Sequence, residues 1–91
     1  MNDIDTIEKI KGTLRTLQVE FVKVKQWNEK TFKVEISSDA FEGLRRLERF
    51  ELLDKLLKER LPEIASEYEF LYKPFTKKEW EERNLQKATK S

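Results

Sequence analysis

The chain contains no cysteine and no histidine among its 91 residues. Without cysteine it has no disulfide, no thiolate nucleophile and no Cys ligand for an iron–sulfur cluster. Without histidine it lacks the usual general base at neutral pH and the commonest metal ligand. Its only two glycines, Gly12 and Gly43, are too few for a glycine-rich phosphate loop. These absences exclude most enzyme classes, so we expect a non-enzymatic protein with no metal and no cofactor.

Long apolar runs are also missing. The longest is Phe70-Leu71-Tyr72, whereas a membrane helix needs about 20 apolar residues. The acidic residues 1–5 carry no apolar stretch of the kind that a secretory signal requires. We therefore expect a cytoplasmic protein without a membrane span. Its length suits one domain, which we place at residues 1–86, followed by a disordered tail at 87–91.

Charged residues make up 41% of the chain, against about 25% in an average domain. The signs are balanced, with 19 basic and 18 acidic residues and a net charge of +1. A strongly cationic nucleic-acid-binding protein would have a large excess of basic over acidic residues. Any anion-binding function must therefore depend on local clusters of basic residues.

The first half of the chain predicts a helix followed by a β-hairpin. Apolar residues at helical spacing predict a helix over residues 3–16. A strand follows over 17–26, in which the apolar alternation slips by one residue between Phe21 and Val22. The slip indicates either a β-bulge or a central strand covered on both faces. After a turn at 27–30, strict alternation over 31–37 predicts an antiparallel partner strand.

The second half predicts helices around one further strand. Asp39 with Glu42 resembles a capping box, which predicts a short helix from Ala40 to about Gly43. A longer helix then runs to about Arg60, because Pro62 disfavours its continuation. Residues 63–67 are interpreted as a connector, and a third strand is expected over 68–73.

A complete capping box predicts a last helix. Thr76 would cap it, Glu79 would reach back, and Phe75 and Trp80 sit at the positions of a hydrophobic staple. The helix is expected to end near Gln86. The predicted order is α-β-β-α-α-β-α, an α+β fold with a three-stranded mixed sheet and helices packed on one face.

Two strings in this order resemble the BolA family. The first, residues 32–43 (FKVEISSDAFEG), is similar to the family's strand ending in V-S-D-x-F-E-G. The second, residues 76–80 (TKKEW), is similar to its T-x-x-E-W. The resemblance implies a class II KH-like fold with a helix-turn-helix-like unit. It also implies one of two roles: a DNA-binding transcription regulator of stress responses, or a partner of monothiol glutaredoxins that supplies a His ligand to a shared [2Fe-2S] cluster.

The chain departs from the family where that chemistry resides. The family's R-H-R string falls on residues 49–51, of which only Arg49 matches. The His that ligates the cluster falls on Tyr68, and a second family His falls on Thr31. We therefore do not expect this chain to ligate a cluster. Tyr68 as a phenolate ligand is the alternative that the sequence leaves open.

Basic residues supply the candidate nucleic-acid contacts. Arg45, Arg46 and Arg49 follow the break at Gly43, and Arg side chains suit phosphate oxygens. Three residues of the hairpin, Lys23, Lys25 and Lys33, could extend this basic surface, for which the expected partner is duplex DNA. The alternative is a solvated face balanced by neighbouring glutamates. The G-x-x-G loop of KH domains is not present, because Gly43 has no second glycine near it.

Four residues are the candidate contacts to a protein partner, namely Trp27, Phe41, Gly43 and Tyr68. Trp27 at the hairpin turn would be either an exposed anchor or a ring folded back over the sheet. The leading hypothesis is a regulator that binds DNA around Gly43. The alternative is an adaptor that docks on a monothiol glutaredoxin without supplying a ligand. In either case we expect a monomer or weak homodimer.

Overall fold

The computed structural model describes the backbone of residues 4–90 and the side chains of residues 4–85. It has the predicted α+β order, with two short 3₁₀ turns in addition. The elements are α1 (Ile4–Leu14), η1 (Arg15–Leu17), β1 (Val19–Asn28), β2 (Thr31–Ser38), η2 (Asp39–Phe41), α2 (Arg46–Arg60), α3 (Pro62–Glu67), β3 (Glu69–Phe75) and α4 (Lys77–Lys90). No helix within residues 4–90 combines the length and apolar character that crossing a bilayer demands.

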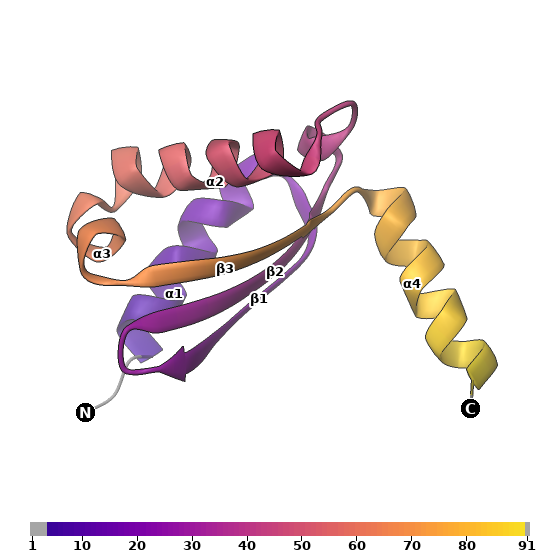
Figure 1. Cartoon of the computed structure of the whole chain (residues 1–91), viewed down its shortest axis with the longest axis horizontal. Coiled ribbons are helices and arrows are strands. Elements are labelled where there is room, and N and C mark those ends of the chain that lie inside the picture. Colours follow the sequence, from indigo (N-terminus) through magenta and orange to yellow (C-terminus); the bar gives the residue numbers. More distant parts are fainter. Residues whose placement is uncertain (1–3, 91) are drawn as a thin grey trace.

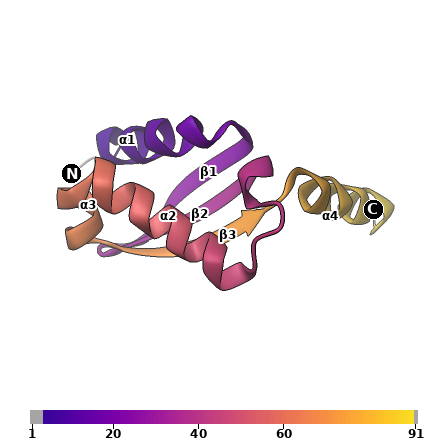
Figure 2. The same ribbon diagram turned by 90° about the horizontal axis from the view of Figure 1, so that it is seen from above.

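The three strands form one mixed sheet in the order β1-β2-β3. The β1–β2 pair is antiparallel and the β2–β3 pair is parallel. Helices α1, α2 and α3 cover one face of this sheet, whereas α4 leaves the end of β3 and projects beyond it (Figures 1 and 2). The other face of the sheet is therefore open over most of its length.

The core lies between the helices and the covered face of the sheet. Phe32, Val34 and Ile36 alternate along β2 and are fully buried, as the period-2 pattern predicts. Helices α1 and α2 pack their apolar stripes against them, through Ile10, Leu14, Leu53 and Leu57. Two further leucines of α2, Leu52 and Leu56, are partly buried against this core.

Strand β1 resolves the slip in its pattern with a β-bulge. The register shifts between Val19 and Phe21, so Glu20 is the extra residue. β1 is an edge strand, and the alternative of a central strand is wrong because β2 occupies that position. The bulge turns Phe21 to the open face, where its ring stacks on Trp80 at 4.3 Å between centroids. Val24 is left in the core.

The middle helices differ from the prediction. The Ser38 hydroxyl, and not Asp39, accepts the capping bond from the backbone N–H of Ala40, and the element that follows is a single 3₁₀ turn. The true partner of α2 is α3, which was interpreted as a connector. Pro62 ends one helix and begins the next, since a proline is favourable at the first position of a helix, whose N–H has no partner there.

The C-terminal segment confirms the capping box. Glu79 N–H donates to the Thr76 hydroxyl at 3.1 Å, and Thr76 N–H donates to the Glu79 carboxylate at 2.9 Å. Strand β3 continues through Pro74, which an edge strand tolerates because its missing N–H can face away from the sheet. Helix α4 extends to Lys90, beyond the predicted end at Gln86. Ser91 lies outside the described residues, and the disorder of 87–91 stays a prediction.

Candidate functional site

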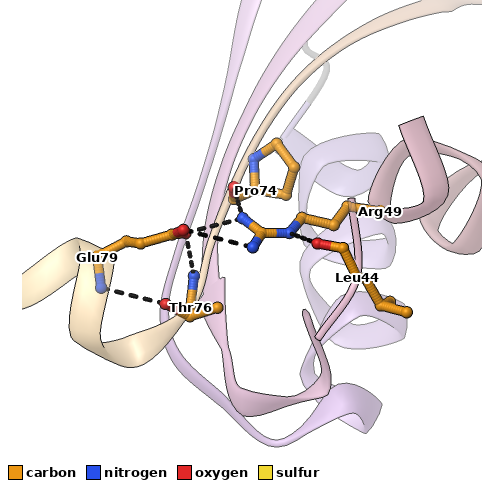
Figure 3. Close-up of polar contacts among 5 residues, drawn as sticks. All are labelled: Leu44, Arg49, Pro74, Thr76 and Glu79. Carbon is orange, nitrogen blue, oxygen red and sulfur yellow. Dashed lines mark hydrogen bonds and ion pairs between the residues drawn. The ribbon is translucent and has the colours of Figure 1, made fainter. Parts of the chain in front are cut away.

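Arg49 joins three segments of the chain at one end of the sheet (Figure 3). Its Nε donates to the carbonyl oxygen of Leu44 at 3.0 Å and its Nη1 to that of Pro74 at 3.2 Å. The same Nη1 lies 2.7 Å from Oε1 of Glu79 in α4. Only 13% of the Arg49 side chain is exposed. Arg49 is therefore engaged in holding α2, β3 and α4 together.

The Glu79 carboxylate is shared between that contact and the α4 cap. It accepts hydrogen bonds from Arg49 and from the backbone N–H of Thr76. These bonds favour the charged form, so the Arg49 hydrogen bond first, and then the Thr76 bond, lower the pKa of Glu79 below its ordinary value. The arrangement is a partly exposed ion pair between two elements, and it positions helix α4.

The other two candidate arginines are exposed, and Arg46 but not Arg45 lines one hollow together with Arg49. Arg45 precedes α2, and its backbone N–H donates to Glu48 at 2.7 Å. The Arg46 guanidinium lies 5.6 Å from the ring centroid of Phe50. Glu48 thus bonds to the backbone of Arg45, a phenyl ring lies beside the Arg46 guanidinium, and Arg49 has little free surface.

The four candidate partner residues lie at two opposite ends of the sheet. Tyr68 immediately precedes β3, and Glu69 N–H donates to the Lys30 carbonyl at 2.7 Å, so Tyr68 lies at the hairpin end together with Trp27. Phe41 and Gly43 follow the far end of β2. A single small interface cannot contain all four.

Phe41 and Gly43 have structural roles at their end. Phe41 is fully buried in the core, so its side chain is not available to a partner. Gly43 has a φ of +77°, in the left-handed region that favours glycine, and is exposed in the turn before α2. Of this pair only the Gly43 turn can contact another molecule.

At the hairpin end, Trp27 is 58% exposed. One side of its ring is occupied by Lys33, whose Nζ lies 3.6 Å from the ring centroid. Of the two alternatives for Trp27, the structure thus combines an exposed ring with a contact to the sheet. Such a cation–π pair contributes about 0.5–1 kcal/mol at an exposed site.

Tyr68 occupies the position at which the resemblance implies a cluster ligand. Its half-buried ring packs edge-on against Phe32, with centroids 4.8 Å apart. Within residues 4–90 there is no group of three or more His, Cys, Asp or Glu that could hold a metal ion. Because the chain also has no thiol or imidazole, its residues do not fit a ligand set for a [2Fe-2S] cluster.

Lys23 and Lys25 lie apart from the arginines, on the open face of the sheet. There they join three further cationic side chains around a hollow of about 220 Å³, and we call these five residues the cationic sheet face: Lys23, Lys25, Lys33, Lys73 and Arg83. Lys73 and Arg83 are not among the contacts predicted from the sequence. Alternation along β3 could place Lys73 beside Leu71, but nothing local in the sequence shows that β3 pairs with β2.

The order of the elements and the mixed three-stranded sheet define a small α+β domain with a KH-like arrangement of strands and helices. The family model for BolA-like proteins matches residues 13–66, more than half of the chain. The chain therefore belongs to the BolA-like family, as its two strings predicted. No curated protein matched it.

Solved structures agree with this assignment. The crystal structure of a Bol-like protein from Babesia bovis is 26% identical, covers 86% of this chain and 92% of its own, and has a TM-score of 0.73. Yeast Fra2 is 28% identical, with coverages of 88% and 84% and a TM-score of 0.63. The BolA domain of SufE1 from Arabidopsis thaliana, 24% identical with coverages of 81% and 94% and a TM-score of 0.70, shows the shared fold.

Proposed function

We propose that this chain is a non-enzymatic adaptor that docks on a monothiol glutaredoxin without supplying an iron–sulfur ligand. Membership of the BolA-like family supports the partner class. The proposal that the chain supplies no ligand depends on the side chain at the family's ligand position, which is Tyr68 with its ring packed against Phe32. The partner must therefore provide every ligand of any cluster that it holds.

Docking is placed at the hairpin end of the sheet, because Tyr68 lies there. Exposed side chains surround Tyr68 at this end, among them Lys30, Glu67 and Glu69. Trp27 lies at the corner between this end and the open face. An exposed indole is a common anchor in protein interfaces, so Trp27 stays a predicted partner contact.

Duplex DNA binding around Gly43 has weaker support from the geometry. The mechanism needs three arginines that face a common phosphate backbone. Arg49 instead donates its hydrogen bonds to two carbonyl groups and to Glu79. No specific observation at the start of α2 favours this function over docking on a protein.

The test is a titration of the chain into a monothiol glutaredoxin that carries its [2Fe-2S] cluster, followed by calorimetry and visible absorption. We expect a complex with one copy of each chain. Tyr68→Phe should leave both the Kd and the cluster spectrum unchanged, because it removes only a hydroxyl. Tyr68→His should alter the spectrum, because it places an imidazole at the family's ligand position.

A pair of charge reversals tests the location of docking. Glu67→Arg with Glu69→Arg should weaken the complex at least tenfold, about 1.4 kcal/mol. The matched control is Glu81→Arg with Glu82→Arg on α4, which makes the same charge change at the other end of the molecule and should leave the Kd unchanged. Absence of any complex, or loss of the cluster spectrum in Tyr68→Phe, would refute the proposal.

A further inference from the structure

We propose that the cationic sheet face is a binding site for single-stranded nucleic acid, which adjoins the glutaredoxin-docking end at Trp27. The helices α1, α2 and α3 lie on the opposite side of the sheet, and α4 projects from its end, so no other element within residues 4–90 covers the centre of this face (Figures 1 and 2). The hollow of about 220 Å³ at its centre is lined by all five cationic residues.

The strand register brings these charges together. Lys23 lies opposite Glu35, which in turn lies opposite Lys73, so one row crosses all three strands. In the next row Lys25 lies opposite Lys33. Alternate residues of a strand are roughly 7 Å apart and neighbouring strands about 4.8 Å. Four lysines are thus held within one small area by the backbone alone.

The carboxylate within the array does not neutralise it. Glu35 Oε2 lies 3.3 Å from Nη1 of Arg83, so this carboxylate already has a cationic partner from α4. Lys25 and Lys33 remain a like-charge pair directly across two strands, an arrangement that destabilises a sheet. A bound polyanion would remove that repulsion. Since the net charge of the chain is only +1, this concentration of lysines is a local feature of the face.

Aromatic character distinguishes a nucleic acid from an acidic peptide as the occupant. The exposed ring of Trp27 stands at the edge of the array, in contact with Lys33. Cations that track a backbone, combined with an aromatic ring on which a base can stack, are the features of single-strand binding surfaces. The carboxylates of an acidic peptide would pair with the lysines, but they carry no ring that could stack on the indole.

The shape of the face favours a single strand over a duplex. The major groove of DNA admits a helix or a two-stranded ribbon, whereas this face is three strands wide. An open sheet can support splayed bases, as in other sheet-based RNA-binding modules. Lysine provides point charges without bidentate base recognition, so we expect little sequence preference.

The experiment measures the fluorescence anisotropy of labelled 12-mers of thymidine and of uridine at ~50 mM salt. Both strands should bind, and a preference between them tells DNA from RNA. The slope of log affinity against log salt should be about −0.7 for each phosphate neutralised. The triple variant Lys23→Gln, Lys25→Gln, Lys73→Gln should bind at least tenfold more weakly and lose about 2 from the magnitude of that slope.

The matched control is Lys9→Gln, Lys55→Gln, Lys58→Gln, which removes the same charge from exposed positions on the helices. It should bind nearly as well as the unmodified chain. Amide chemical shifts of the unmodified chain provide a readout that needs no variant, and they should move at the strand residues of the cationic sheet face and not in α2.

Three outcomes would overturn the proposal. One is equal binding of a 12-base-pair duplex, and another is an equal loss in the control variant. The third is displacement of the strand by an equally tight poly-glutamate peptide, which would make the face a docking site for acidic proteins. Glutaredoxin binding by the triple variant should be unchanged, so failure of this proposal is distinguishable from failure of the docking proposal.

Discussion

Arg49 in α2 and Glu79 in α4 are thirty residues apart in the chain, and their side chains meet at 2.7 Å between Nη1 and Oε1. The same Glu79 carboxylate completes the capping box of α4 through Thr76. The Glu79 carboxylate thus both caps the first turn of α4 and attaches this helix to α2. Helix α4 otherwise projects away from the sheet (Figure 1). This contact, the stacking of Trp80 on Phe21 and the Arg83–Glu35 ion pair therefore determine where the helix lies.

Arg49→Ala should destabilise the domain by about 1–2 kcal/mol. The variant removes hydrogen bonds to two carbonyl groups and one carboxylate, and we discount the ion pair because Glu79 is 46% exposed. For a domain of this size the melting temperature should fall by about 5–15 °C. Circular dichroism melts would measure it, with Arg46→Ala as the control that changes little. Equal melting points for the two variants would contradict this role of Arg49.

The contribution of Glu79 should disappear in acid. Because folding lowers the pKa of Glu79 below its ordinary 4.5, its carboxylate stabilises the fold above that pH. The stabilisation is lost as the pH falls through the lower, folded-state pKa. Urea midpoints should therefore separate the unmodified chain from Glu79→Gln at pH 7 and converge as the pH falls below 4.5. A separation that stays constant with pH would be inconsistent with the ion pair.

Tyr72 should make the domain sensitive to alkali. Burial, followed by the charge of Asp54 at 3.3 Å from its hydroxyl, raises the pKa of Tyr72 above its ordinary 10.0. The stabilisation from the neutral phenol is fully present below pH 10 and is lost as the pH rises above it. Tyr72→Phe should therefore lose less stability than the unmodified chain between pH 9 and about 11. Melting temperatures at both pH values would show it, with Tyr68→Phe as the comparison.

The two glycines should respond in opposite directions to alanine. Gly12 lies inside α1 with nothing within 4 Å of an added Cβ, so Gly12→Ala should stabilise by about 1 kcal/mol. Gly43 also has open space around it, but its φ of +77° is strained for alanine. Gly43→Ala should cost about 1–2 kcal/mol. Thermal melts should show shifts of opposite sign, and a shared sign would mean that one backbone assignment is incorrect.

Much of the fold follows from local patterns. The alternation in 31–37 assigns the faces of β2 whatever strand lies beside it, because successive side chains always point to opposite faces. The capping box at Thr76 and Glu79 was also predictable, since both of its bonds connect residues three positions apart. The bulge was one of two interpretations of the slip near Phe21, and deciding between them required knowing that β1 lies at an edge.

The middle of the chain shows where local patterns mislead. Asp39 and Glu42 have the spacing of a cap, but Ser38 at the end of β2 is in place to accept the bond. Pro62 was read only as the end of a helix, although the same fixed φ also suits the first residue of α3.

The candidate sites depend on contacts between distant segments. Lys73 joins Lys23 and Lys25 only because β3 pairs in parallel with β2, and such pairing carries no local signal in the sequence. The same holds for Arg49. Its spacing predicted a surface cluster with Arg45 and Arg46, but its side chain is largely buried because it pairs with Glu79 of α4. Residue types and short spacings therefore established the elements, the buried alternation and the lack of cluster ligands. Packing of remote segments established which charges are free to meet another molecule, because electrostatic neighbours are set by distance in space.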